Sequence, residues 1–477
     1  MPVHVSKVSL VQAMPRIRVI PGVPYFLTDD GRPWTPVGDN DAITWPHLAP
    51  LFRRRDLAAV ERHLLDLRAH GVTCIRLMLE YCHGEHRYLE RPAGRFVPNM
   101  VQLWDDLFAL LERTGLRVLL TPYDTFFMWI RWRRHPYAQA DSGLRVGRDG
   151  WLTSPEMRRA IKDRLAFASD RWGGSPALFA WDLWNEIHPA HGGNDPAAVA
   201  PFIADLSDWL RARERERWGY ANLQTVSIFG PELVRHPVLV DPIFRHPTLD
   251  FANTHLYEHG TIDDPRDTVA PALAVARLMR AAVIAAGPNR PVFDSEHGPI
   301  HSFKDRKRTL ASDFDDEYFR HIQWAHLASG GAGGGMRWPN RHPHVLTRGM
   351  REAQRALADF LPLIDWSTFR RRNLTAELTC DDPGMAVVGC GDERQALAWL
   401  VPTDAFSERG TLRPREKASA TTLRVPGLTD GRYAVVTYDT RTGGILRRDR
   451  ATSANGVLAV SLDPIRYDLA IAIDPVT

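Results

Sequence analysis

Short apolar runs alternate with amphipathic helical stretches along residues 16–365 of the chain. Each run has the length of a strand, and most runs end in a polar or aromatic residue before the next helical stretch. The predicted strands are residues 34–38, 72–78, 116–122, 178–184, 223–229, 249–254, 291–295 and 333–338. Repeated strand–helix units indicate a parallel sheet, and eight strands are the number that closes a barrel. The predicted fold class is therefore α/β, a (β/α)8 TIM barrel.

Helix signals support this pattern. Residues 53–71 and 101–115 place apolar side chains at helical spacing, and both stretches end in glycine. Residues 154–173 open with Ser154 as an N-cap and Pro155 in the first turn. An open, doubly wound sheet is the alternative. It normally has fewer strands and a glycine-rich turn after the first strand, which this sequence lacks.

The pattern changes after Trp366, where short alternating runs are separated by Gly, Pro and Asp turns. This pattern is typical of a small antiparallel β-sandwich. We therefore predict a barrel domain over residues 1–366 and a β-sandwich accessory domain over residues 367–477. Residues 379–390 are predicted as a hairpin that turns at 381–384. Its register does not bring Cys380 opposite Cys390, so all the cysteines are predicted to be reduced.

Composition and charge limit the classes of partner that we expect for this protein. The chain has 477 residues, of which 44% are hydrophobic and 25% charged, as in globular proteins. It has no run of 18 apolar residues, so no membrane partner is expected. The formal net charge of +3 is nearly balanced, so no nucleic-acid partner is expected either. The N-terminus lacks a long apolar segment and a cleavage site, which favours a cytoplasmic location.

Two carboxylates stand at the ends of predicted strands. Glu186 lies in FAWDLWNEIHP after the fourth strand, and Glu296 lies in PVFDSEHGP after the seventh. Catalytic groups of a barrel sit at the C-terminal ends of its strands, so both side chains can face one mouth. Two facing carboxylates about 5–5.5 Å apart are what a retaining glycoside hydrolase needs. A single glutamate at a strand end is more often a salt-bridge partner, and the argument therefore rests on the pair.

Further polar and aromatic residues lie at or near other strand ends. The candidates for substrate binding are Asn40, Arg76, Asp124, Asn185, His255, Tyr257 and Trp338. Asp182 and Asp294 share the inward parity of their strands, and we expect them to be buried anchors rather than catalytic groups. Asp124 is open to two interpretations, a substrate contact or a loop anchor.

These segments resemble the glycoside hydrolases of clan A, most closely the family 5-like, mannanase- and cellulase-like retaining β-glycosidases. The resemblance rests on WNE after strand four, SEHG after strand seven, an arginine in strand two, H-x-Y at strand six and tryptophan at strand eight. It covers roughly residues 16–365. The chain departs from the commonest pattern where NEI replaces NEP and where no aromatic residue follows the nucleophile. These departures concern the sugar more than the reaction.

The resemblance implies a role for each residue. Glu186 would be the acid/base and Glu296 the nucleophile that forms a covalent intermediate by double displacement. Asn185 would bind the sugar 2-hydroxyl, and Arg76 and Tyr257 would keep Glu296 ionised. His255 would line the same wall, and Trp338 would stack under the sugar ring. The resemblance implies no cofactor or metal, and a carbohydrate, most favourably a β-mannoside or β-glucoside, as the substrate.

Two rival functions remain at this point. The first is a catalytically inactive carbohydrate-binding barrel, and the second is a metal-dependent barrel hydrolase. HGEH (83–86) and HPAH (188–191) lack the HExxH spacing of a helical zinc site, which favours substrate-facing histidines. SGGAGGG (329–335) precedes its strand, which indicates a crowded strand entry rather than a phosphate cradle.

Three long loops follow strands two, three and four, at residues 80–99, 123–153 and 187–196. Loops beyond about 12–15 residues are uncommon and usually functional. All three rise on one side of the predicted mouth, and together they should close one end of the groove. A closed end favours exo-like action or cleavage of short oligosaccharides.

Overall fold

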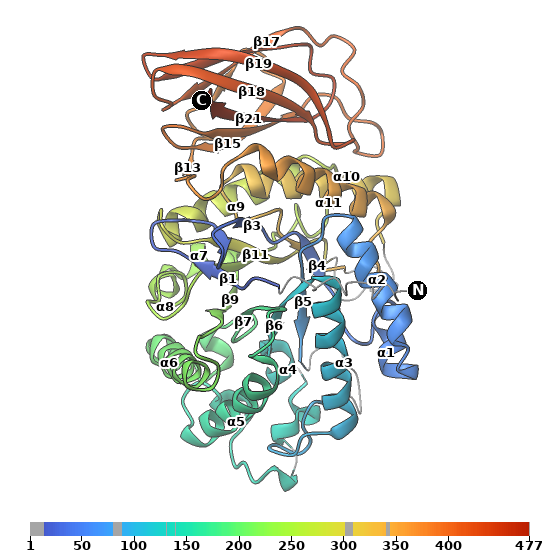
Figure 1. The fold of residues 1–477 in the computed structure, drawn as a ribbon, viewed down its shortest axis with the longest axis vertical. Coiled ribbons are helices and arrows are strands. Elements are labelled where there is room, and N and C mark those ends of the chain that lie inside the picture. Colours follow the sequence, from blue (N-terminus) through green and yellow to red (C-terminus); the bar gives the residue numbers. More distant parts are fainter. Residues whose placement is uncertain are drawn as a thin grey trace, which may run out of the picture.

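The computed structural model describes residues 14–79, 88–129, 131–138, 140–300, 309–339 and 344–476. A barrel of parallel strands is surrounded by helices, and an antiparallel sheet packs beside helices α10 and α11 (Figure 1). Among the described residues, no helix has the length and hydropathy needed to cross a membrane.

The barrel closes with eight strand positions. Its parallel strands pair in the order β8-β7-β6-β5-β4-β12-β11-β10-β9. β8 and β9 are two halves of one segment, separated by Val226; β8 pairs with β7, and β9 pairs with β10. The predicted TIM barrel is therefore confirmed. The strands are β4 (Gly38–Asn40), β5 (Cys74–Met78), β6 (Arg117–Thr121), β7 (Leu178–Asp182), β8 (Leu223–Thr225), β9 (Ser227–Phe229), β10 (Ala252–Leu256), β11 (Val292–His297) and β12 (Met336–Arg337).

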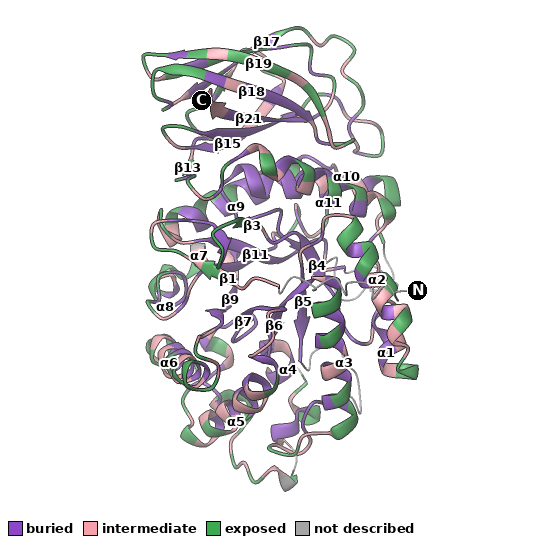
Figure 2. Ribbon diagram, viewed as in Figure 1, coloured by how far each residue is buried: buried purple, intermediate pink, exposed green. Residues whose placement is uncertain are grey.

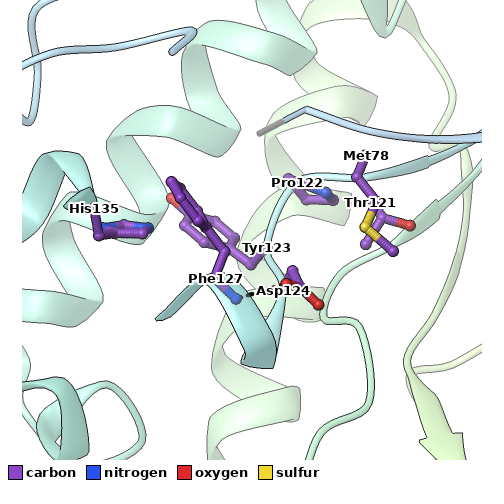
Figure 3. Close-up of a pocket in the computed structure, with 7 residues that line it drawn as sticks. All are labelled: Met78, Thr121, Pro122, Tyr123, Asp124, Phe127 and His135. Atoms are coloured by element: carbon purple, nitrogen blue, oxygen red, sulfur yellow. Dashed lines mark hydrogen bonds between the residues drawn. The ribbon is translucent and has the colours of Figure 1, made fainter. Parts of the chain in front are cut away.

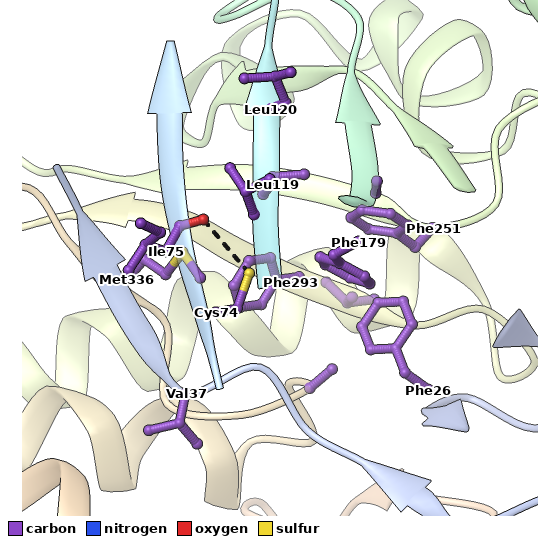
Figure 4. Close-up of a cluster of buried hydrophobic side chains, with 14 of the residues drawn as sticks. Phe26, Val37, Cys74, Ile75, Leu119, Leu120, Phe179, Phe251, Phe293 and Met336 are labelled. Carbon is purple, nitrogen blue, oxygen red and sulfur yellow. Dashed lines mark hydrogen bonds between the residues drawn. The ribbon is translucent and has the colours of Figure 1, made fainter. Parts of the chain in front are cut away.

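The predicted first strand was wrong in position. β3 (Pro33–Trp34) pairs with β2 (Phe26–Thr28), which pairs with β1 (Ile17–Val19) in a small antiparallel sheet. The ring of Phe26 lies 5.0 Å from that of Phe179 and 5.2 Å from that of Phe251, so this sheet plugs the N-terminal end of the barrel (Figure 4). Trp34 thus belongs to this plug, and the barrel strand β4 begins only at Gly38.

Helices cover the outside of the barrel with their buried faces turned inward (Figure 2). The predicted caps are confirmed: α3 ends at Gly115, which has φ 72°, and Ser154 Oγ accepts a hydrogen bond from Met157 N at the start of α5. The larger helices are α1 (Ala49–Arg54), α2 (Leu57–Ala69), α3 (Pro98–Thr114), α5 (Pro155–Trp172), α6 (Val199–Trp218), α9 (Ala270–Ala286), α10 (Ser312–Ala328) and α11 (Arg348–Phe360). The short helices are α4 (Thr125–Trp129), α7 (Pro231–Arg235) and α8 (Val240–Phe244).

The C-terminal β domain is a single antiparallel sheet in the order β13-β15-β16-β21-β18-β19-β20-β17-β14. It encloses a core of its own that includes Leu423, Val435 and Ile471. The strands are β13 (Arg372–Asn373), β14 (Thr379–Cys380), β15 (Met385–Gly391), β16 (Ala396–Pro402), β17 (Thr421–Pro426), β18 (Gly431–Asp439), β19 (Gly444–Ala454), β20 (Val457–Leu462) and β21 (Leu469–Pro475).

The predicted hairpin over residues 379–390 is wrong. β14 pairs with β17, whereas β15 pairs with β13 and β16, so the turn at 381–384 carries the chain between the two ends of the sheet. Arg415 forms ion pairs with Asp382 and with Asp404, which hold this turn in place. Cys380, Cys390 and Cys74 are free, as predicted, and Cys82 lies outside the described residues.

One face of the second sheet belongs to the same apolar core as the barrel helices. Trp399 is fully buried, and its Nε1 donates to Asp468 Oδ2 at 3.2 Å. Asp468 also lies 2.9 Å from Arg320 and 3.4 Å from His321, both on α10. Burial raises the pKa of Asp468, but the charges of Arg320 and His321 outweigh it and bring this pKa well below its usual value. The sheet is therefore fixed to the barrel by apolar packing and by a buried ion pair.

Truncation after Asp365 should give an insoluble or destabilised barrel, because it uncovers the apolar faces of α10 and α11. As a milder test, Trp399→Ala should cost about 3–5 kcal/mol of unfolding free energy, measured by denaturant titration. The matched control is Leu446→Ala, since Leu446 is 59% exposed, and it should stay within about 0.5 kcal/mol of the parent. A soluble and fully active truncated barrel would contradict this prediction.

Candidate active site

The two predicted carboxylates meet at the C-terminal end of the barrel. One oxygen of Glu186, one oxygen of Glu296 and a ring nitrogen of His255 all lie within 4.8 Å of one another. His255 Nδ1 lies 2.8 Å from Glu186 Oε1 and 3.7 Å from Glu296 Oε2. Both glutamates are 9% exposed, so each is largely withdrawn from water but still reachable. The fold thus joins residues that are 110 positions apart, on segments following β7 and within β11.

The backbone at Glu186 has an unusual conformation. Its φ is 48°, in the left-handed region that non-glycine residues seldom occupy. The Glu186 N–H donates to Ser227 Oγ at 3.1 Å, and its carbonyl accepts a bond from Thr125 Oγ1 at 2.9 Å. Such a conformation costs on the order of 1–3 kcal/mol and persists where surrounding contacts enforce it. Here neighbours from two adjacent strand ends enforce it, and the side chain is thereby aimed at Glu296.

Arg76 is the centre of a buried polar network beneath the carboxylates. Its guanidinium is fully buried and binds four side chains through Nη1 and Nη2. The partners are Glu296 (2.8 Å), Asn40 (3.1 Å), Asp182 (2.9 Å) and Asn185 (2.5 Å). Tyr257 Oη donates to the other oxygen of Glu296 at 2.8 Å. Each oxygen of Glu296 therefore accepts a hydrogen bond, which favours its charged form and fixes its direction.

The environments of the two carboxylates differ. Burial raises the pKa of Glu186 to about 7, an effect that Arg76 opposes and the nearby charge of Asp182 reinforces. Burial also raises the pKa of Glu296, but the charge of Arg76 and the bond from Tyr257 act in the opposite direction. A single proton shared by the pair is therefore best placed on Glu186. Burial lowers the pKa of His255 to about 4, so its ring is neutral between them.

Asp182→Asn should shift the basic limb of the pH profile of kcat/KM to lower pH. The negative charge of Asp182 raises the pKa of Glu186, so its removal lets Glu186 lose its proton earlier. The measurement is kcat/KM for an aryl glycoside against pH, with circular dichroism to confirm folding. Asp208→Asn is the matched control, because Asp208 is an exposed residue of α6. An unmoved basic limb in a folded Asp182→Asn variant would contradict the assignment.

Two residues that were predicted to bind substrate, Asp124 and Asn40, form hydrogen bonds within the protein. Asp124 accepts a bond from Asn185 Nδ2 at 2.6 Å and one from Phe127 N, also at 2.6 Å, so it anchors both Asn185 and the start of α4. Burial raises the pKa of Asp124 to about 7. Asn40 Nδ2 donates to the carbonyl of Ser295 at 2.9 Å and so ties β4 to β11.

A small pocket at Asp124 is lined by Met78, Thr121, Pro122, Tyr123, Asp124, Phe127 and His135 (Figure 3).

Aromatic side chains at the mouth divide into exposed and buried groups. Trp338 is partly exposed just after β12, and the ring of Trp45 meets it edge-on at 5.1 Å. Trp129 is also partly exposed on α4, and its ring lies 4.8 Å from that of His191. Trp151 and Trp184, in contrast, are fully buried and stack at 4.1 Å. The motif HGEH (83–86) lies outside the described residues.

A layer of histidines behind Glu296 has no clear sequence signal. Asp294 is fully buried, as expected of an anchor; it accepts a bond from Glu296 N at 3.1 Å and lies 2.8 Å from His297 Nδ1. His326, on α10, accepts a bond from Asp294 N at 3.2 Å. This layer holds the backbone of Glu296. The parity of β11 indicated Asp294, but His326 comes from a helix 30 residues further along, and no local pattern connects it to the site.

The glycine tract 329–335 is a crowded entry to β12, as predicted. A Cβ at Gly333 would lie 2.1 Å from the carbonyl oxygen of Pro36, and one at Gly331 would lie 2.3 Å from the ring of His326. A Cβ at Gly335 would come within 2.8 Å of Asp294. Only glycine allows the chain to pass this close to the histidine layer.

Comparison with known proteins agrees with this geometry. No protein family model matches the chain. A glycoside hydrolase of family 5 from Bacteroides vulgatus superposes with a TM-score of 0.59 at 11% identity, over 96% of this chain and 93% of that one. The endo-β-1,4-mannanase of Thermotoga petrophila superposes with a TM-score of 0.51 at 14% identity, over 90% and 91%. The chain has the fold of the family 5 glycoside hydrolases. The resemblance inferred from the sequence is confirmed at that level.

Two further matches are narrower. A family 5 mannosidase from Rhizomucor miehei, solved with mannosyl-fructose, superposes with a TM-score of 0.50 at 13% identity, over 68% of this chain and 85% of that one. "Probable mannan endo-1,4-beta-mannosidase F" of Emericella nidulans is 36% identical over 62 residues. That match spans 13% of this chain and 14% of the relative.

Proposed function

We propose that the protein is a retaining β-glycoside hydrolase that acts on β-linked oligosaccharides or glycosides. One observation carries the proposal: oxygens of Glu186 and Glu296 lie within 4.8 Å of each other. Retaining enzymes hold their carboxyl groups about 5–5.5 Å apart, whereas inverting enzymes leave about 6.5–9.5 Å for a water molecule. The spacing therefore favours direct attack by one carboxylate.

The reaction has two displacements. Glu296 attacks the anomeric carbon as Glu186 donates its proton to the leaving glycosidic oxygen, which gives a glycosyl ester of Glu296 and a free alcohol. Glu186, now ionised, takes a proton from water, and the resulting hydroxide displaces Glu296 from the anomeric carbon. Arg76 and Tyr257 favour the charged form of Glu296 at the start and at the end. Asn185, held by Arg76 and Asp124, is placed to bind the 2-hydroxyl.

A β-mannoside is the favoured substrate, and a β-glucoside is the second choice. The support is that three of the similar proteins carry mannan- or mannoside-directed names. A panel of p-nitrophenyl β-glycosides, with soluble β-mannan and β-glucan, tests the proposal. Turnover fastest on the mannoside is expected. No turnover of any β-glycoside by folded protein would favour the inactive carbohydrate-binding barrel instead.

The protein should act on short substrates or chain ends. The loop over residues 123–153 is packed around the buried side chains of His135 and Trp151, and Trp129 of this loop contacts His191 of the loop after β7. This arrangement supports a groove closed at one end. Reducing ends should therefore appear from soluble mannan with little change in viscosity. A rapid fall in viscosity at low conversion would show internal cleavage and contradict the prediction.

A metal-dependent mechanism has one feature in its favour, because Glu186, His255 and Glu296 could surround a cation. However, Arg76 already lies 2.8 Å from Glu296 and supplies positive charge at that place. Activity that survives prolonged chelator treatment separates the two-carboxylate mechanism from this alternative.

A further inference from the structure

A second cluster of ligand-type side chains lies on the rim of the mouth. Glu232 and His236 belong to the segment of α7, after β9, and His188 lies in the loop after β7, two residues beyond Glu186. Glu232 Oε2 lies 3.2 Å from His236 Nε2 and 3.5 Å from His188 Nε2. One donor atom from each of the three residues lies within 4.8 Å of the other two.

These separations match a small tetrahedral ion. Zn²⁺ binds histidine nitrogen and carboxylate oxygen at about 2.0–2.2 Å, which places neighbouring ligands about 3.3–3.5 Å apart in a tetrahedron. The two distances from Glu232 fall close to this range. Two imidazoles and one carboxylate also form a donor set suited to zinc and other transition metals rather than to calcium or magnesium.

The cluster contains a buried nitrogen atom, His188 Nε2, that makes no hydrogen bond of normal length. Its contact with Glu232 Oε2 is 3.5 Å long. Buried polar atoms are nearly always paired in folded proteins, and affinity for an ion is one of the regular explanations for exceptions.

Two further contacts orient the carboxylate of Glu232 and fix the tautomer of His188 when no ion is bound. Arg235 Nη1 donates to Glu232 Oε1 at 2.9 Å, which leaves Oε2 for the histidines. His188 Nδ1 accepts a bond from Ala190 N at 3.1 Å, which places the ring proton on Nε2 when no ion is bound. A cation at Nε2 requires the other neutral tautomer, in which the ring proton lies on Nδ1 and the bond from Ala190 N is lost. Because protons compete with a cation for the histidine nitrogens, the affinity should fall as pH falls.

We propose that His188, Glu232 and His236 form a zinc-binding site, with water in the fourth position. The ion would tie the loop that follows Glu186 to α7, on the rim of the mouth. This site consists of residues separate from Glu186 and Glu296, and it does not depend on the proposed glycosidase activity.

Calorimetric titration of the chelator-treated, dialysed full chain with Zn²⁺ tests the proposal. We expect about one ion per chain and a zinc-dependent rise in Tm. His236→Gln should weaken binding by roughly tenfold or more and abolish the rise in Tm. His236 is exposed, so this variant should fold. His188→Gln should have the same effect, whereas His259→Gln, at an exposed histidine outside the cluster, should bind zinc as the parent does.

Two results would overturn the proposal. One is a parent protein that binds no zinc at neutral pH. The other is a parent whose zinc binding persists unchanged in both His188→Gln and His236→Gln, which would place the ion elsewhere.

Discussion

Glu296→Gln is expected to lower kcat/KM by about 10⁴-fold or more, because the amide cannot form the glycosyl ester on which both displacements depend. In the parent protein, Arg76 and Tyr257 occupy one oxygen each and direct the carboxylate toward the mouth. A 2-fluoro glycoside should therefore attach covalently to Glu296, and peptide mapping by mass spectrometry should locate the label there.

The matched control for this substitution is Glu352→Gln. Glu352 lies on α11, pairs with Arg348 and is exposed, so its loss should leave turnover unchanged. A label found on any other residue, or a Glu296→Gln variant that retains its rate, would remove Glu296 from the role of nucleophile.

Glu186→Ala should slow cleavage of substrates with poor leaving groups by roughly 10²–10⁴-fold. Activated aryl glycosides should lose less, because their leaving groups need little protonation. Azide should restore turnover and give a β-glycosyl azide, since it attacks the ester of Glu296 from the face that Glu186 served. An α-azide would show inversion and contradict double displacement.

The pH dependence of kcat/KM gives a second test of the role of Glu186. Burial raises the pKa of Glu186 to about 7, so the acid form is present below that pH and is lost above it. The parent should therefore lose kcat/KM as the pH rises through about 7, and Glu186→Ala should lack this basic limb. A variant that keeps the limb would show that another group supplies the proton.

The sequence predicted the barrel because most of its strands are continuous apolar runs, buried on both faces. β4 escaped prediction because its residues, Gly38, Asp39 and Asn40, carry no apolar pattern and are specified by close packing against β5. A Cβ at Gly38 would lie 1.7 Å from the carbonyl oxygen of Cys74. The hairpin at 379–390 failed for a related reason: its turn was recognised, but strand pairing is decided by partners distant in sequence.

The site divides in the same way. Glu186 and Glu296 could be identified because each follows a predicted strand, and strand order places both at one mouth. The contacts of Arg76 with Asn40, Asp182 and Asn185, the left-handed backbone at Glu186 and the support from His326 could not be predicted. They depend on side-chain directions and on distances between elements. The alternation of inward and outward positions along a strand does not determine either of these.

The glycine tract 329–335 has a consequence for how this protein can vary. By composition it resembles a linker, where substitutions and insertions are usually harmless. In the structure it packs closely against Pro36, His326 and Asp294, one layer behind Glu296. A side chain added there would push on the layer that holds Glu296 in place. The composition of this segment suggests tolerance of substitution, but it is among the segments that tolerate substitution least. Its glycines are required because no side chain fits beside the residues that hold Glu296.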